Sequence, residues 1–136
     1  MRDLEFINLA SDVETILLVD DDARILAPLQ MLLEAEGYRV LLASDGDAAV
    51  GVTDREHPDL IVTDWMMPVL DGVGFCQRLK ANKVMARIPI VMLTAVVPPV
   101  PAQPLWNALL RKPTPVASLI GIIRDLLARS SGRASP

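Results

Sequence analysis

The chain has 136 residues, 51% of them hydrophobic and 22% charged, which excludes an intrinsically disordered protein. The formal net charge of -4 leaves no basic surface for nucleic acid, so direct binding to DNA or RNA is not expected. Cys76 is the one cysteine, which rules out an internal disulfide and fits a reducing compartment.

The first residues, MRDLEF, carry acids where a secretion signal would need a basic start, and the most apolar region, 88–100, is too short to span a bilayer. We therefore expect a cytoplasmic protein without a membrane anchor. Residues 1–14 are predicted to be an N-terminal extension, residues 15–129 a single domain, and residues 130–136 a tail or linker.

Strands and helices are predicted to alternate along this domain. Short apolar runs predict five strands at 15–19, 38–43, 60–64, 88–94 and around 108–110. Apolar residues at helical spacing predict a helix that Asp22 caps and Gly37 stops, a short helix ended by His57-Pro58, and helices over 73–82 and 116–129. This alternation favours a parallel sheet with helices on both faces.

The connection between the fourth and fifth strands breaks the pattern. It holds prolines at positions 98, 99, 101 and 104, so no α-helix of ordinary length is predicted there. Trp106 follows these prolines, and the sequence leaves open whether it covers the space of a missing helix or is an exposed anchor for a partner.

Polar residues follow four of the five strands. Asp20 and Asp21 follow the first, Asp64 ends the third, Thr94 ends the fourth and Lys112 follows the fifth. Because the carboxyl ends of parallel strands share one edge of the sheet, these side chains are expected to converge. Three carboxylates favour an oxygen-bound cation such as Mg²⁺, while a hydroxyl and an ammonium can hold phosphoryl oxygens. An aspartate at such an edge is a candidate nucleophile toward phosphorus.

The motifs ILLVDDD, PDLIVTDWMMPVLDG, PIVMLTA and RKP occur in the order found in response regulator receiver domains, which the chain resembles from about residue 15 to 129. The resemblance implies a flavodoxin-like five-stranded sheet of order 2-1-3-4-5. It also implies a switch that is phosphorylated by a histidine kinase or phosphotransfer protein, catalyses only its own phosphorylation and dephosphorylation, and signals to a further protein. A homodimer is left open.

The same resemblance assigns roles residue by residue. Asp64 is the phosphoacceptor, Thr94 the switch hydroxyl and Lys112 the lysine that holds the phosphoryl group, with a cis peptide bond before Pro113. Mg²⁺, or Mn²⁺, is implied to be held by Asp20, Asp21 and Asp64 together with the backbone carbonyl of Met66.

Two departures from the family pattern are visible. Leu109 stands where the family usually has Tyr or Phe, so the usual aromatic reporter is absent. Thr94 and Lys112 are 18 positions apart, shorter than the family's gap by about one helical turn, which predicts that a proline-rich loop replaces the fourth helix. An altered output surface is therefore expected.

Two other functions stay open at this stage. The spacing Asp20-Asp21-Asp22 resembles that of magnesium phosphohydrolases of the haloacid dehalogenase type, with Asp20 as nucleophile, although Arg24 stands where that family tends to place Thr or Val. The shortened output region also fits an interaction module that keeps the fold without being phosphorylated.

Overall fold

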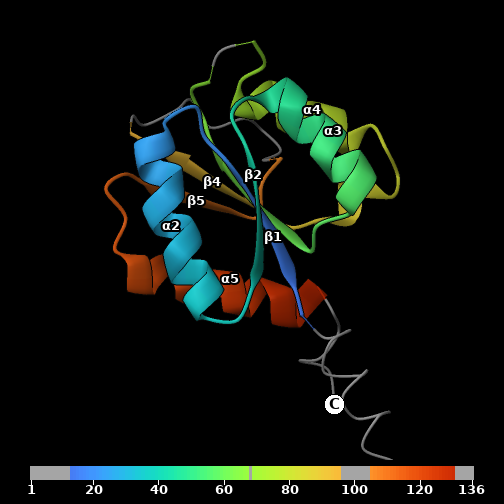
Figure 1. The fold of residues 1–136 in the computed structure, drawn as a ribbon. Coiled ribbons are helices and arrows are strands. Elements are labelled where there is room, and N and C mark those ends of the chain that lie inside the picture. Colours follow the sequence, from blue (N-terminus) through green and yellow to red (C-terminus); the bar gives the residue numbers. More distant parts are fainter. Residues whose placement is uncertain (1–12, 68, 96–104, 131–136) are drawn as a thin grey trace, which may run out of the picture.

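The computed structural model describes residues 13–67, 69–95 and 105–130 and shows an open α/β sheet (Figure 1). Five parallel strands form the sheet in the order β2-β1-β3-β4-β5. The strands are β1 (Thr15–Val19), β2 (Arg39–Ala43), β3 (Leu60–Asp64), β4 (Ile90–Thr94) and β5 (Ala108–Arg111). The helices are α2 (Ala23–Ala35), α3 (Gly46–Glu56), α4 (Gly72–Lys80) and α5 (Val116–Ser130), with a short 3-10 turn, η1 (Met85–Arg87).

The three central strands are buried along their whole length. Their runs of Ile, Leu and Val carry no outward-facing polar positions, which is typical of a parallel sheet covered on both faces. The register pairs Val19 with Thr63 and Asp64 with Leu93, so β1, β3 and β4 end at nearly the same height. The residues that follow these strands therefore share one edge.

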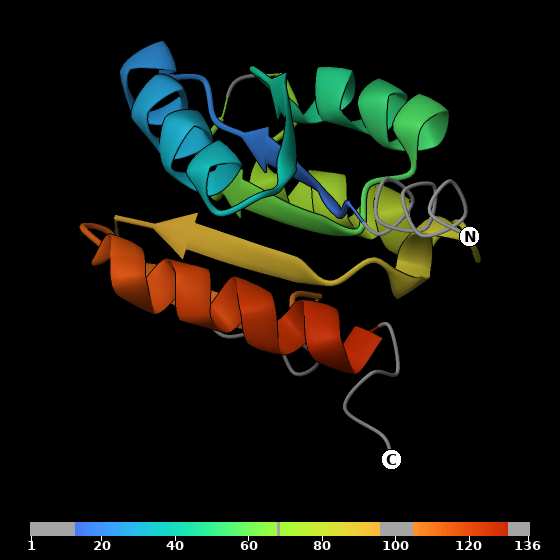
Figure 2. The ribbon, with the colours of Figure 1, turned by 60° about the horizontal axis from the view of Figure 1, so that its bottom comes forward.

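Helices cover the sheet in two layers. One apolar cluster joins α2 and α5 to one face through residues such as Leu33 and Ile123, and Figure 2 shows α5 lying along β4. The second cluster joins α3 and α4 to the opposite face through Ala49 and Phe75. The two helix layers thus shield the two faces of the strands.

The structure confirms the predicted fold class and most element positions. β1 and β3 have the predicted bounds, and α4 buries Phe75, Cys76 and Leu79. Boundaries differ by one or two residues elsewhere: β4 begins at Ile90 rather than residue 88, and α4 spans Gly72–Lys80 rather than 73–82. The peptide bond before Pro113 is cis, as predicted.

Helix α2 does not bury all of its apolar side chains. The helix buries Leu26 and Leu33, whereas Ile25 and Leu32 remain 37% and 42% exposed. Asp22 caps the helix as predicted, since its side chain accepts a hydrogen bond from the backbone N–H of Arg24. The helix therefore presents apolar side chains both to the core and to its outer side.

Several predictions fall outside the described residues. The proposed loop in place of a fourth helix concerns residues 96–104. Most of the predicted extension (1–14) and tail (130–136) also lies outside, namely residues 1–12 and 131–136. Within the interval between β4 and β5, residue 95 and residues 105–107 belong to no helix. No helix in the described ranges combines the length and apolar character needed to cross a membrane.

Candidate functional site

Asp64 is the last residue of β3, at the center of the sheet edge. The four residues before it are fully or almost fully buried, which fixes the strand, and Asp64 itself is 9% exposed. Its Oδ1 atom accepts a hydrogen bond of 3.0 Å from the backbone N–H of Trp65. The carboxylate is thus held by a rigid element while it reaches the rim of the sheet.

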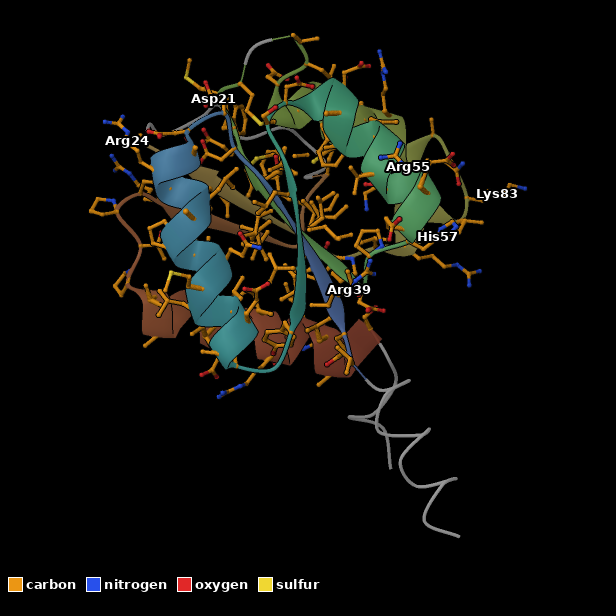
Figure 3. The ribbon with its side chains drawn as sticks, in the orientation of Figure 1. Asp21, Arg24, Arg39, Arg55, His57 and Lys83 are labelled. Atoms are coloured by element: carbon orange, nitrogen blue, oxygen red, sulfur yellow. The ribbon has the colours of Figure 1, made fainter. Side chains whose placement is uncertain are left out.

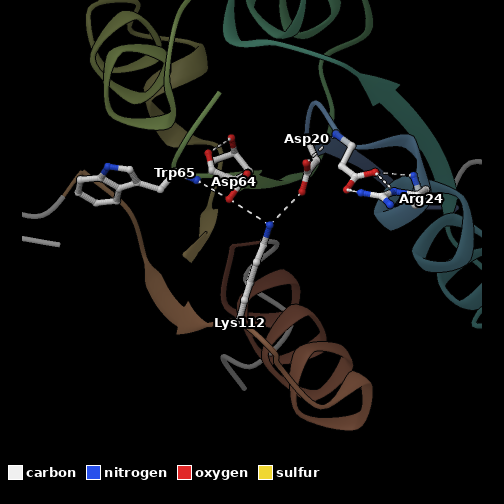
Figure 4. Close-up of polar contacts among 7 residues, drawn as sticks. Asp20, Arg24, Asp64, Trp65 and Lys112 are labelled. Carbon is white, nitrogen blue, oxygen red and sulfur yellow. Dashed lines mark hydrogen bonds and ion pairs between the residues drawn. The ribbon is translucent and has the colours of Figure 1, made fainter. Parts of the chain in front are cut away.

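Lys112 links Asp64 to Asp20, as Figure 4 shows. Its Nζ atom lies 3.1 Å from Oδ2 of Asp20 and 3.1 Å from Oδ1 of Asp64. The lysine follows β5, and its own backbone N–H donates to the carbonyl of Thr94 at 2.7 Å. Residues 92 positions apart therefore meet in one polar cluster, as the strand order predicts.

The electrostatics of this cluster reflect burial and pairing together. Burial raises the pKa of Asp64 above its usual value, although the hydrogen bond and charge of Lys112 act in the opposite direction. For Lys112, burial acts to lower the pKa, but its hydrogen bonds to Asp20 and Asp64 outweigh burial and raise it. Lys112 is therefore a fixed positive charge between two carboxylates at neutral pH.

The three acids can also form a cation site. Carboxylate oxygens of Asp20, Asp21 and Asp64 lie within 4.8 Å of one another, with Asp21 exposed and the other two buried. An oxygen-only donor set with one open side suits Mg²⁺, which keeps several water ligands. Figure 3 places Asp21 at the outer rim of the molecule, next to the start of α2. The residues present thus fit a divalent ion of this kind.

The two remaining predicted site residues lie along the same edge. Thr94 ends β4, is 1% exposed, and pairs in register with Arg111 of β5. Met66 lies two residues beyond Asp64 with a 66% exposed side chain, and its assignment as a backbone metal ligand stays a prediction. His57 caps the far end of α3, before β3 begins, and lies away from Asp21 in Figure 3.

Sequence reasoning did not find the part that Trp65 plays beside Asp64. Its backbone N–H is shared between the Asp64 carboxylate and the carbonyl of Leu93, and its ring packs against Trp106. Trp106 is partly buried on the apolar cluster under α3 and α4, which favours the space-covering alternative over a fully exposed anchor. The only sequence signal was the position of Trp65 directly after the acid.

An apolar groove of about 540 Å³ adjoins the site. It runs between α2 and the start of α5, and Lys112 lies at its boundary with the polar cluster. The side chains that line it are mainly aliphatic: Ile25, Pro28, Leu29, Leu32, Val116 and Leu119 are among them. The exposed apolar side of α2 thus faces this groove.

A parallel α/β domain with acids and a lysine gathered at the carboxyl edge of its sheet has groups that can bind a divalent cation and accept a phosphoryl group there. The model of the response regulator receiver domain matches residues 16–108, and the chain belongs to this family. Receiver domains are phosphorylation-activated switches of two-component signalling, are generally not classed as enzymes, and bind Mg²⁺ at an aspartate cluster such as the one formed by Asp20, Asp21 and Asp64. Histidine kinases phosphorylate them.

Curated relatives match over part of their length. The chain is 50% identical over 80 residues to the alkaline phosphatase synthesis transcriptional regulatory protein PhoP of Bacillus subtilis, covering 59% of this chain and 32% of that protein. It is 48% identical over 82 residues to the probable transcriptional regulator ycf27 of Porphyridium aerugineum, covering 60% of this chain and 33% of that protein. The chain thus spans about a third of the length of these relatives.

Solved structures agree with the fold. The receiver domain of a histidine kinase from Syntrophus aciditrophicus matches with a TM-score of 0.81 and 29% identity, covering 91% of this chain and 95% of that one. A sensor histidine kinase receiver domain from Pseudomonas aeruginosa, described with a magnesium ion coordinated in its active site cleft, matches with a TM-score of 0.76 and 31% identity over 85% of this chain and 98% of that one.

Proposed function

We propose that Asp64 accepts the phosphoryl group of this switch, delivered by a histidine kinase or a phosphotransfer protein. The observation that carries the proposal is the Lys112 ammonium at 3.1 Å from carboxylate oxygens of both Asp20 and Asp64, with Asp21 in the same cluster. A buried acid held beside a fixed cation is suited to take up a dianionic group, because the lysine stabilises the charge that arrives.

The proposed transfer is a displacement at phosphorus. An oxygen of Asp64 attacks the phosphorus atom of a phosphorylated imidazole, and the O–P bond forms as the N–P bond breaks. The electron pair stays on the imidazole nitrogen, which takes a proton from solvent. Lys112 and the hydroxyl of Thr94 hold the phosphoryl oxygens. Water then attacks the phosphorus atom of the acyl phosphate, the O–P bond to Asp64 breaks, and inorganic phosphate leaves. The domain thus acts on its own residue and not on successive substrate molecules.

The metal role follows from the same residues. Asp20, Asp21, Asp64 and the backbone carbonyl of Met66 would hold Mg²⁺ or Mn²⁺, which would supply positive charge to the transferred phosphoryl group. In this proposal Asp64 would serve both as a metal ligand and as the phosphoryl acceptor. Residues 15–129 form the receiver domain in this proposal, with flanking segments at 1–14 and 130–136.

The test is incubation with acetyl phosphate and Mg²⁺, followed by intact mass. The native protein is expected to gain one phosphoryl group, and Asp64→Asn is expected to gain none. Asp71→Asn is a matched control, because Asp71 is an exposed acid that caps α4 and asparagine also caps helices. A phosphoryl group on Asp64→Asn, or none on the native protein, would refute the assignment.

The same samples separate the two alternative functions. Multiple turnover of a phosphate monoester that survives Asp64→Asn and is lost with Asp20→Asn would favour the phosphohydrolase. Spectra and partner binding that do not respond to a phosphate analogue with Mg²⁺ would favour a module that works without phosphorylation. The match to the receiver family argues against the phosphohydrolase.

We propose that the donor's helix carrying the phosphohistidine lies in the apolar groove between α2 and α5. Lys112 borders both the groove and the acids, so a helix seated there brings its histidine to Asp64. Leu32→Asp, a change at a 42% exposed position, is expected to slow transfer from a phosphorylated phosphotransfer domain about tenfold or more, and to leave the reaction with acetyl phosphate unchanged. Met31→Asp, on a 71% exposed residue outside the groove lining, is the control.

We also propose that the output surface differs from the family's usual one, because four prolines lie between β4 and β5. Residues 96–104 are expected to exchange their amide hydrogens rapidly in both phosphorylation states. Slow exchange typical of a stable helix in this segment would show that the proposal is wrong.

A further inference from the structure

The two tryptophans of the chain pack against each other beside Asp64. Trp65 follows the acid directly, and Trp106 precedes β5. Their ring centroids are 5.3 Å apart at an interplanar angle of 67°, an edge-to-face arrangement. Both rings are partly buried on the apolar cluster that joins α3 and α4 to the sheet. A ring contact of this geometry adds to the stabilisation that burial alone provides.

The backbone of Trp65 is held at three points. Its N–H lies 2.9 Å from the carbonyl of Leu93 and 3.0 Å from Oδ1 of Asp64, and its carbonyl accepts from the N–H of Gly72 at 2.9 Å. Figure 4 shows the bond from Trp65 to the carboxylate, next to the ion pair with Lys112. A shift of this peptide group would therefore alter one of the bonds that orient Asp64.

Trp106 is anchored through the next residue. The backbone N–H of Asn107 donates to the carbonyl of Ile90 at 2.8 Å, and its side-chain oxygen accepts from the N–H of Ile90 at 2.9 Å. These two hydrogen bonds hold the residue before β5 against the first residue of β4. Three residues after Trp106 lies Leu109, which offers the same cluster an aliphatic side chain. Trp65, the neighbour of Asp64, thus contacts Trp106, just before β5, through an aromatic ring pair.

We propose that Trp106 is a positioning residue that acts on Asp64 through Trp65, so that the state of Asp64 and the placement of the β5 entry influence each other. The inference rests on the proposed role of Asp64 as phosphoacceptor. When the carboxylate becomes an acyl phosphate, its oxygen loses charge, and the N–H of Trp65 and the ammonium of Lys112 gain new acceptors on the phosphoryl group. Because coupling is reciprocal, the ring pair both orients the acid and responds to its modification.

The first experiment compares rates of phosphorylation by acetyl phosphate with Mg²⁺, measured by intact mass well below the melting temperature of each variant. Trp106→Ala is expected to slow the reaction about two- to tenfold, the range that an aromatic pair can supply. Trp106→Phe is expected to restore most of the rate because it keeps a ring edge. Leu105→Ala removes a side chain from the same cluster but keeps both rings, and it is expected to change only the melting temperature.

The second experiment uses emission from Trp106 alone. Trp65→Phe keeps a ring at position 65 and leaves Trp106 as the single tryptophan, so its emission is expected to change on phosphorylation. Trp65→Ala removes the contact and is expected to abolish most of that change. An unchanged rate in Trp106→Ala, or unchanged emission in a phosphorylated Trp65→Phe sample, would overturn the inference while Asp64 remains the acceptor. If the native protein gains no phosphoryl group, the proposed function fails and the inference fails with it.

Discussion

Lys112 connects the ends of three strands with one ammonium group. It follows β5 and pairs with Asp20 after β1 and with Asp64 at the end of β3, at 3.1 Å in both cases. Its side chain is 21% exposed, so the pairs are screened less than those at the surface. Before a cation or a phosphoryl group arrives, the lysine therefore offsets the repulsion between the acids.

Removing this charge is expected to have opposite effects on metal binding and on chemistry. Lys112→Ala should tighten Mg²⁺ binding about three- to tenfold, because a nearby positive charge no longer competes for the carboxylates. The same variant should be phosphorylated about a hundredfold more slowly, since the proposed donor to the phosphoryl oxygens is lost. Titration with Mg²⁺ and intact mass after acetyl phosphate measure the two effects. Arg111→Ala, at the exposed neighbouring position, should change neither, and a parallel fall in both quantities for Lys112→Ala would contradict the argument.

Cys76 gives a pH-dependent prediction away from the site. It is fully buried on α4, and burial raises the pKa of its thiol from 9.0 to about 12. The folded protein thus binds this proton more tightly than the unfolded chain does, so stability falls as pH rises from about 9 to 12. Cys76→Ala should lower stability at pH 8 by about 1 kcal/mol through lost packing, yet lose less stability than the native protein between pH 9 and 12. Denaturant unfolding at these pH values is the measurement, and identical pH slopes would contradict it.

At the scale of elements, α3 and the loop after β3 pack so closely that one position allows no side chain. A Cβ atom on Gly46 would lie 2.2 Å from the backbone oxygen of Leu70, which accepts a hydrogen bond from the Gly46 N–H at 3.1 Å. Because the obstacle is backbone, the loop that carries Leu70 would have to move. The same loop joins Asp64 to α4, so this contact helps to hold the site.

Gly46→Ala is therefore expected to destabilise the protein by about 1–3 kcal/mol, the usual cost of overpacking. Gly121→Ala is the matched control, because a Cβ atom at Gly121 meets nothing within 4 Å and alanine favours the helix α5. That control should raise stability by about 0.5–1 kcal/mol. Thermal unfolding of the two variants distinguishes the cases. If Gly46→Ala kept the native stability and phosphorylation rate, the loop that carries Leu70 would be able to move without destabilising the protein, which would contradict the prediction.

The elements also show what the sequence can and cannot predict. β1 and β3 were predicted residue for residue because each is an unbroken apolar run that ends in an acid. The convergence of Asp20, Asp64 and Lys112 followed from the strand order, since parallel strands end together. The contact between Trp65 and Trp106 was not predicted, because both residues lie outside regular elements, where no periodicity fixes the direction of a side chain. The apolar groove was missed because helical spacing did not separate the exposed Ile25 from the buried Leu26.

At the scale of the whole molecule, the acidic site exists only when the sheet is formed. Asp20 and Asp64 come from adjacent strands, and the register that pairs Val19 with Thr63 brings their carboxylates to one edge. The unfolded chain separates these residues by 44 positions and offers a divalent ion no preformed group of ligands. A cation that binds the folded state alone must therefore stabilise the whole fold.

Mg²⁺ is consequently expected to raise the melting temperature of the native protein. At a concentration about 100 times the dissociation constant, the gain is roughly 2.7 kcal/mol. Asp21→Asn should lose most of this gain, because Asp21 is the exposed member of the cluster and its replacement leaves the buried pair with Lys112 in place. Asp54→Asn, on the exposed side of α3, should keep the full gain. Thermal unfolding in Mg²⁺, compared with KCl of equal ionic strength, separates specific binding from screening. Equal gains in the native and Asp21→Asn proteins would mean that the ion does not bind at the three aspartates.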